Sequence, residues 1–151
     1  MTARQAAVAT VERVLRDHPD VASRRLGDGA WAVVLPGTIR FSIPVTVEVG
    51  VRTTTISSFL LRGPRQDRSG DPAALHRILL RKNLATHRVH LALDRDDDVV
   101  LVARLPTAGL AAEEVEAVLA EVLTVGESAF EALVHLGYPG VFPPLRRPPQ
   151  P

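Results

Sequence analysis

The sequence contains no cysteine among its 151 residues. This absence excludes thiol catalysis, zinc–thiolate centres and disulfide bonds, and it is compatible with a reducing compartment. Lysine is nearly absent too, since Lys82 is the only one, so arginine carries almost all of the positive charge. The formal net charge is only +1, and therefore no bulk charge attracts the chain to nucleic acid or to a membrane surface.

Long apolar runs are missing as well. Residues 29–39 form an uncharged stretch of 11 residues, but Pro36 and Gly37 interrupt it, and a membrane helix needs about 20 apolar residues. Charged residues between Arg4 and Asp17 leave no apolar core for a secretory signal. Aromatic residues make up only 4% of the chain, which offers few rings for stacking on single-stranded nucleic acid. We expect a cytoplasmic protein without a membrane segment.

Hydrophobic periodicity predicts the secondary structure. Apolar residues at helical spacing predict a first helix over Ala3–Asp17, and Asp71 followed by Pro72 marks the start of a second. A last apolar stripe predicts a helical region near the C-terminus, which Gly126 is expected to break or kink before a further segment, 127–136. The predicted strands are residues 30–35, 39–49, 52–62, 89–93 and 99–105.

The order of these elements, αβββαββα, indicates the fold class. Strands bunched on both sides of a helix favour an α+β fold with one antiparallel sheet over a parallel sheet. We predict a single domain over residues 1–138, in which the helices pack on one face of the sheet. Residues 139–151 hold six prolines and are predicted to be a Pro-rich C-terminal tail without regular helix or sheet.

One predicted strand, residues 99–105, is apolar on both faces. Val99 and Leu101 lie on one side, and Val100 and Val102 lie on the other. One layer of helices covers one face only, and monomers rarely expose large apolar patches. A second copy of the chain is the simplest cover for the other face, followed by another protein and by the Pro-rich tail. The residues expected at this interface are Ile56, Leu60, Val100 and Val102.

No motif in the sequence indicates catalysis or metal binding. Residues 94–98 hold three aspartates at the spacing that begins a calcium loop, but Val99 and Leu105 stand where that loop needs glycine and glutamate. We therefore expect a polar hairpin turn. His87 and His90 have no third ligand nearby in the sequence. The glutamates of the last helix lie opposite its apolar stripe and are expected to be solvated. We predict no catalytic residue, no cofactor and no metal.

Basic residues in the middle of the chain leave a second hypothesis open. Nucleic-acid binding needs such charges on one surface, and single-strand binding usually adds stacking aromatics, of which this region has only Phe59. Solvated arginines are the favoured interpretation, and an arginine-based nucleic-acid-binding regulatory protein is the alternative. The residues concerned are Arg62, Arg65, Arg68, Arg77, Arg81, Lys82 and Arg88.

Short motifs, in their order and spacing, resemble the YbjN-like family, which shares the type III secretion chaperone-like fold. The resemblance covers residues 31–138, and its longest motif is residues 75–83 of the predicted second helix. The other motifs are Leu35-Pro36-Gly37, Ser58-Phe59 with Arg62 and Pro64, Leu93-Asp94 with Asp98, Leu101 with Arg104-Leu105-Pro106, Phe130, and Leu136-Gly137-Tyr138. Residues 96–98 read Asp-Asp-Asp where the family usually has Asp-Gly-Asp, and the tail past Tyr138 does not look familial.

This resemblance implies a non-enzymatic, dimeric protein-binding module of chaperone-like or regulatory type. It implies an unidentified protein partner, and it supplies no catalytic residues. On the motif helix, His76, Arg77 and Arg81 lie away from the leucine stripe and are further candidates for the interface.

Overall fold

The computed structural model of the chain describes residues 1–38, 42–63 and 71–137. This part contains three α-helices, a short 3-10 helix and six strands. None of the described helices combines the length and the apolar character that a bilayer crossing requires. In chain order the elements are α1 (Ala3–Asp17), β1 (Ala22–Gly27), β2 (Ala30–Pro36), β3 (Ser42–Val49), β4 (Thr53–Leu61), α2 (Pro72–Lys82), η1 (Asn83–Ala85), β5 (His90–Leu93), β6 (Val99–Pro106) and α3 (Ala112–Gly137).

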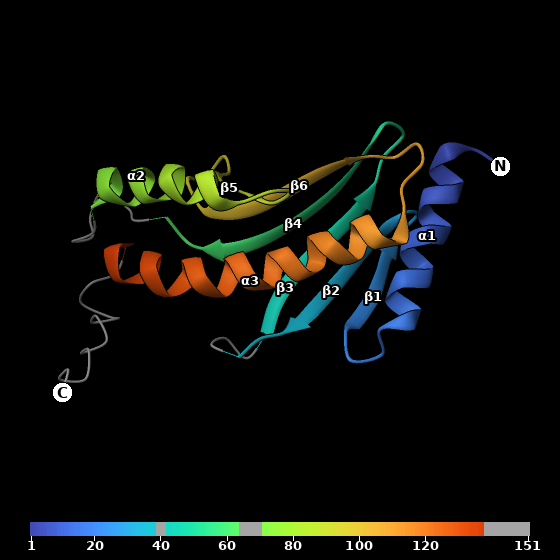
Figure 1. The fold of residues 1–151 in the computed structure, drawn as a ribbon, viewed down its shortest axis with the longest axis horizontal. Helices are drawn as coiled ribbons and strands as arrows, with labels where there is room; N and C mark the ends of the chain where they lie inside the picture. The colour runs from blue at the N-terminus through green and yellow to red at the C-terminus, as the bar shows by residue number, and fades with distance from the viewer. Residues whose placement is uncertain (39–41, 64–70, 138–151) are drawn as a thin grey trace.

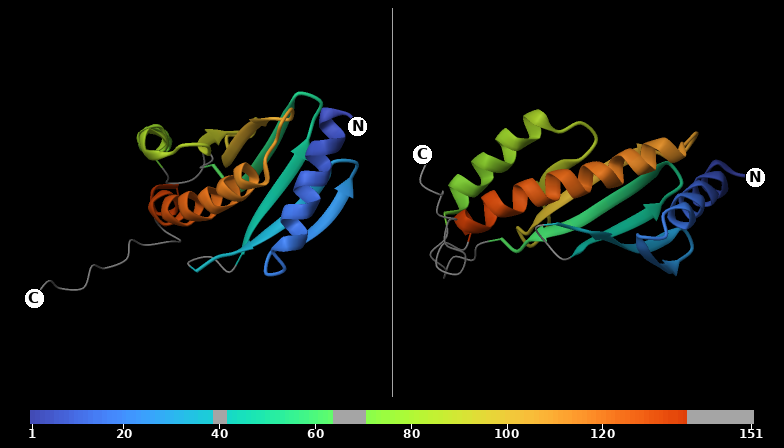
Figure 2. Two further views of the ribbon diagram at one scale, coloured as in Figure 1. Left: turned by 45° about the vertical axis from the view of Figure 1, so that its right-hand side comes forward. Right: turned by 60° about the horizontal axis from the view of Figure 1, so that its bottom comes forward.

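The six strands form one antiparallel sheet in the order β1-β2-β3-β4-β6-β5, so β1 and β5 are its edges. The three α-helices lie on one face of this sheet (Figures 1 and 2). α1 covers the β1 side, α3 crosses the sheet diagonally, and α2 lies beside α3 near β5. The predicted α+β class, the antiparallel sheet and the helices on one face are therefore confirmed, and the predicted elements follow one another in the predicted order.

The structure adds one strand, β1, that the periodicity does not predict. All six of its residues are exposed at the sheet edge, so no apolar alternation marks it. It joins β2 through a turn at Asp28-Gly29, in which Gly29 adopts a φ of 72°. An Asp-Gly pair directly before an apolar run is a hairpin signal, and this pair is the feature of the sequence that points to β1.

The last helix is continuous, which corrects the predicted break at Gly126. α3 runs unbroken through this position, where it crosses the sheet. A Cβ on Gly126 would lie 3.3 Å from Leu101 Cδ1 and 3.6 Å from Ile43 Cδ1. The glycine therefore allows close approach of the helix to the sheet, and the packing of α3 offsets the low helix propensity of this residue.

Caps and apolar stripes explain why α1 and α2 form where the sequence predicts them. Thr2 Oγ1 accepts a hydrogen bond from the Gln5 backbone N–H at 3.1 Å, and Gln5 Oε1 accepts one from the Thr2 N–H at 2.8 Å, which forms a capping box. Asp71 Oδ1 accepts from the Ala74 N–H at 3.0 Å. The stripes pack with the sheet into one core, whose largest fully buried side chains include Ile43, Ile56, Leu60, Leu75, Leu101 and Leu133.

Candidate functional site

The face of the sheet that points away from the helices, here called the outer face, is not covered by any described element. Alternate residues of the central strands are buried beneath the helices, and the residues between them are exposed or half-buried on the outer face. Along β6, Val99 and Leu101 are fully buried, whereas Val100 and Val102 are half-buried. The predicted two-sided apolarity of residues 99–105 is confirmed.

An apolar band crosses the outer face from strand to strand. The register sets Val34 opposite Pro44, and it sets Phe59 and Ala92 on either side of Val100. Val34 and Phe59 are 41% and 44% exposed, which is high for apolar side chains on a sheet. The outer-face patch is defined as Val34, Pro44, Phe59, Ala92, Val100 and Val102.

Two shallow hollows in the outer face meet at Val100 and Asp94. The first has a volume of about 360 Å³ and lies over β2, β3 and β4, where Phe59 is part of its lining. The second has a volume of about 570 Å³ and lies over β5 and β6. Its polar lining residues are Arg88, His90, Asp94 and Arg104. The outer face is therefore apolar at its centre and mainly basic on the β5–β6 side.

Two of the predicted interface residues lie on the opposite face. Ile56 and Leu60 are 0% and 1% exposed, and they pack in the core beneath the helices. The register sets Ile56 opposite Ala103 and sets Ser57 opposite Val102. Since strand residues alternate between faces, Ile56 does not share a face with Val102. The prediction that groups Ile56 and Leu60 with the outer face is wrong.

The mixed composition of β4 explains this error. Its core face carries Thr54 and Ser58, which are 0% and 2% exposed, while its outer face carries Phe59. The buried hydroxyls have partners: Thr54 Oγ1 lies 3.1 Å from Thr107 Oγ1, and Ser58 Oγ donates to the Pro44 carbonyl at 2.6 Å. Because polar groups with partners can be buried, apolar alternation alone does not reveal which face of β4 packs against the helices.

Helix α2 carries the other three predicted interface residues. Arg77 and Arg81 are exposed, and His76 is half-buried. Sequence reasoning missed Leu80 of α2 and Leu84 of η1, which are 72% and 89% exposed. Their signal in the sequence is that both lie off the buried leucine stripe, four residues apart on one helical face. They form a second exposed apolar surface beside the arginines.

The basic residues of the middle of the chain do not all lie on one side. Arg77 and Arg81 belong to α2, on the helix side of the sheet, whereas Arg88 lines the outer-face hollow. Arg65 and Arg68 lie outside the described residues. The described arginines of this group are therefore divided between two faces, whereas nucleic-acid binding favours a single basic surface.

The side chain of Asn83 pairs with the backbone of the edge strand β5. Asn83 Oδ1 accepts a hydrogen bond from the Leu91 N–H at 2.8 Å, and Asn83 Nδ2 donates to the Leu91 carbonyl at 2.9 Å. This amide occupies the backbone groups that a further strand would otherwise pair with. Asn83 therefore protects β5 from edge-to-edge pairing at Leu91.

A carboxylate of α3 holds the loop in front of β5. Glu121 accepts hydrogen bonds from the backbone N–H groups of His87 at 2.7 Å, Arg88 at 3.1 Å and Val89 at 3.4 Å. Burial disfavours the charged carboxylate, but the three N–H donors outweigh this effect and hold the pKa of Glu121 below its ordinary range. The expectation that the glutamates of this helix are only solvated is wrong for Glu121.

We expect Glu121→Gln to destabilise the protein at pH 7, because the neutral amide is a weaker acceptor for these N–H groups. The folded pKa is depressed, so the contribution of Glu121 is present above the unfolded pKa of about 4.3 and is lost as the pH falls through the folded pKa. In urea unfolding, the difference in unfolding free energy between variant and wild type should therefore shrink as the pH falls through the folded pKa.

Glu131→Gln removes one carboxylate from the same helix and is the matched control; its stability should be close to that of wild type at pH 7. If the difference in unfolding free energy between Glu121→Gln and wild type stays constant from neutral to acidic pH, the charge of Glu121 does not have the stabilising role described here.

Asp94 and Asp98 of residues 94–98 accept hydrogen bonds from backbone N–H groups. Asp94 Oδ1 accepts hydrogen bonds from the N–H groups of Asp96 at 2.9 Å and Asp98 at 3.0 Å. Asp98 Oδ1 accepts one from the Gly63 N–H at 2.8 Å, which ties the hairpin to the end of β4. A polar hairpin turn is what the sequence predicts here, and the structure confirms it. Within the described residues, no group of three or more His, Cys, Asp or Glu side chains is placed to hold a metal ion.

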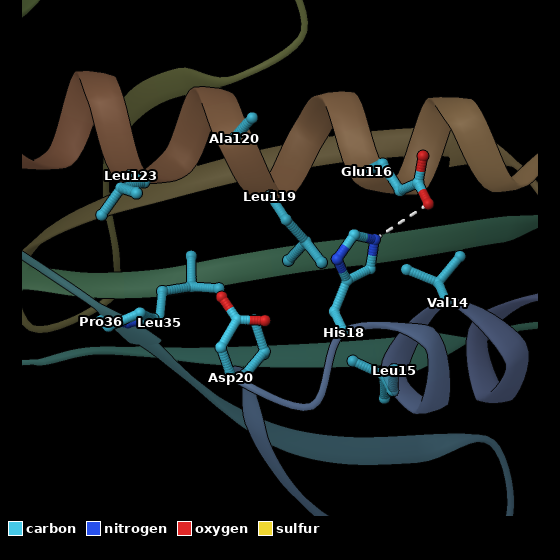
Figure 3. A pocket seen from close by; sticks show the side chains of 11 residues that line it. Val14, Leu15, His18, Asp20, Leu35, Pro36, Glu116, Leu119, Ala120 and Leu123 are labelled. Carbon is cyan, nitrogen blue, oxygen red and sulfur yellow. Dashed lines mark hydrogen bonds and ion pairs between the residues drawn. The ribbon is translucent and has the colours of Figure 1, made fainter.

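A separate pocket of about 200 Å³ lies on the helix side, between the end of α1, β2 and α3 (Figure 3). At its mouth, His18 Nε2 lies 3.0 Å from Glu116 Oε1, and Asp20 is a second acidic residue of the lining. No short sequence motif marks this pocket, because its lining comes from α1, β2 and α3, which are separate in the chain. Its apolar lining residues are Val14, Leu15, Val21, Leu35, Pro36, Leu119, Ala120 and Leu123.

Residues 7–135 match the model of the YbjN family, described as "Putative bacterial sensory transduction regulator". The chain belongs to the YbjN family. The resemblance that the sequence motifs carry is therefore confirmed. The hairpin of residues 94–98 and the hydrogen bonds between Asn83 and Leu91 both lie within the matched part of this YbjN chain.

Mycobacterial proteins are among the relatives of this YbjN chain. An uncharacterized protein of Mycobacterium tuberculosis is 31% identical over 137 residues, which cover 85% of this chain and 73% of the relative. An uncharacterized protein of Mycobacterium leprae is 31% identical over 106 residues, which cover 70% of this chain and 55% of the relative. These relatives support the family assignment and name no activity.

Solved structures with the same fold include type III secretion chaperones. A chain of the HopA1-SchA chaperone-effector complex superposes with a TM-score of 0.58 at 14% identity, covering 82% of this YbjN chain and 91% of the other. The structure of the Yersinia pestis type III secretion chaperone SycH with a stable fragment of YscM2 gives a TM-score of 0.51 at 17% identity, with coverages of 82% and 98%. A chain of the ExsC-ExsE complex gives 0.52 at 16% identity, with coverages of 88% and 97%. These likenesses confirm the fold implied by the resemblance.

Proposed function

We propose that this YbjN protein is a non-enzymatic protein-binding module of chaperone-like or regulatory-adaptor type that works as a homodimer. The observation that carries the proposal is the outer-face patch, which is apolar across five strands and which no described element covers. Burial of apolar surface is favourable by about 25 cal/mol per Å². A stable interface buries about 800 Å² per partner, an area on the scale of a sheet face.

A second copy of the chain is the occupant that we assign to the patch. In a twofold dimer the same surface faces itself, so the apolar centre of one copy meets the apolar centre of the other. The band from Val34 to Ala92 lies at that centre, Arg88 and Arg104 lie toward its β5–β6 side, and Asp94 lies where the two hollows meet. This distribution fits an interface with an apolar core and a polar rim.

The comparisons support the protein-binding part of the proposal. Two structures with this fold are described as a chaperone-effector complex and as a chaperone in complex with a fragment of another protein. The family description refers to regulation of sensory transduction. We carry both properties over to this chain, together with a partner protein that is distinct from the second copy.

An introduced thiol tests the proposal, because the natural chain has no cysteine. Ser57 lines the outer-face hollow and lies opposite Val102. We expect Ser57→Cys to react slowly with a maleimide at high protein concentration and faster on dilution, because only the dimer covers it. Val51→Cys is the matched control, since Val51 is 79% exposed, and its rate should not depend on concentration.

Equal reaction rates for Ser57→Cys at all concentrations would contradict self-association through the outer face.

A parallel assay addresses the alternative function. Binding to random duplex DNA that weakens steeply with added salt would support the nucleic-acid hypothesis, because phosphate contacts release counterions.

A further inference from the structure

The pocket between α1 and α3 has an apolar interior and an acidic rim. Leu119 and Leu123 of α3 line it opposite the end of α1 (Figure 3). Glu116 is 44% exposed at the mouth and pairs with His18. Asp20 also lies there, and it makes no hydrogen bond or ion pair with the described residues. Such a site suits a segment that carries an apolar side chain next to positive charge.

Residues 141–147 of the same chain have that chemistry. They read Val-Phe-Pro-Pro-Leu-Arg-Arg, with the apolar Leu145 directly before Arg146 and Arg147. These residues lie outside the described part of the structure. Proline restricts the backbone before binding, so a Pro-rich segment loses less conformational entropy when it docks.

The length of chain after α3 is sufficient to reach the pocket. Leu123 lies 14 residues before Gly137, which is a distance of about 21 Å along a helix at 1.5 Å per residue. Leu145 lies eight residues after Gly137, and eight residues in an extended polyproline conformation span about 25 Å. A tail that turns back along α3 can therefore place Leu145 beside Leu123, with the arginines further along toward Glu116.

We propose that the α1–α3 pocket is a peptide-binding site and that residues 141–147 of the same chain occupy it. Leu145 fills the apolar interior, and Arg146 and Arg147 face the acidic rim formed by Asp20 and Glu116. The covalent link gives the segment an effective concentration in the millimolar range, so modest affinity suffices. An outside ligand of the same chemistry has to displace the tail, which makes the tail a built-in competitor for this site.

A spin label on the full chain tests the proposal independently of dimerisation. Pro148→Cys supplies a single thiol just beyond the arginines for attachment of a nitroxide. We expect the label to broaden the methyl resonances of Leu119 and Leu123 and to leave those of the exposed Leu84 sharper. Adding Leu145→Asp should restore the Leu119 and Leu123 signals, whereas adding Gln150→Asp, outside the proposed segment, should not.

Sharp Leu119 and Leu123 resonances in the labelled wild-type background would overturn the proposal. Broadening can arise within one chain or between two chains, and a mixed sample separates these origins. In this mixture one population carries the spin label without isotopes, and the other carries the isotopes without a spin label. Broadening that arises only between different chains in this mixture would mean that the pocket takes the tail of another copy, which also overturns it.

Discussion

Leu79→Ala should lower the free energy of unfolding by about 2–5 kcal/mol, because it removes buried methyl groups and leaves a cavity. Leu79 is only 4% exposed on the core side of α2. Leu80→Ala is the matched control at the next position, since Leu80 is 72% exposed, and it should change the free energy by less than about 0.5 kcal/mol. Urea unfolding curves of the two variants measure this difference directly.

Arg77→Ala extends the same test to a predicted interface residue. Arg77 is exposed on α2, so its truncation should cost far less than that of Leu79 if no partner covers the helix. Similar, large losses at Leu79 and Leu80 would mean that α2 presents a different face to the core from the one described.

Elements with one buried and one solvated side are predictable from the sequence. The apolar stripe of α1 predicts the helix with bounds that agree with the structure, and Asp71 with Pro72 marks the start of α2. The alternation along residues 99–105 likewise identifies both faces of β6. In these segments local chemistry and tertiary packing favour the same structure.

Other features depend on partners that periodicity does not show. β1 is held by its pairing with β2 at the sheet edge and buries none of its side chains. Hydrophobic alternation therefore does not predict this strand. The low helix propensity of Gly126 predicts a break, but in the structure Leu101 and Ile43 lie close to this position and α3 continues through it.

The candidate site shows the same limit. Val100 and Val102 lie on the outer face as predicted, but β4 mixes buried hydroxyls with an exposed Phe59, and the face of Ile56 is decided only by its register with β6. Asn83 contacts the backbone of Leu91, 8 residues further along the chain, and Glu121 contacts the backbone of His87, 34 residues before it. No short sequence motif marks either contact.

Val102→Asp should dissociate the proposed homodimer. Val102 lies in the outer-face hollow, where a second copy would bury it, and a buried carboxylate without a partner is strongly unfavourable. A twofold interface contains the substitution twice. Because Val102 is already half-buried in the single chain, loss of its remaining burial is worth roughly half of the 1.5–3 kcal/mol of full valine burial per copy, so the Kd should rise by at least a factor of about ten.

Phe59→Asp provides a second variant whose effect is separable from unfolding. Phe59 is already 44% exposed in the single chain, so the change should leave the monomer folded while it weakens the interface. Val51→Asp places the same charge at a residue that is 79% exposed in the β3–β4 turn, and it should leave the association unchanged. Circular dichroism of each variant separates loss of the dimer from loss of the fold.

Light scattering behind size exclusion tests directly whether the outer face is an interface between two copies of the chain. We expect the wild-type chain to have twice the monomer mass of 16.3 kDa, and we expect Val102→Asp and Phe59→Asp, but not Val51→Asp, to reduce it to the monomer mass. A wild-type chain that remains a monodisperse monomer at high micromolar concentration, with no response to Val102→Asp, would mean that the outer face does not mediate self-association.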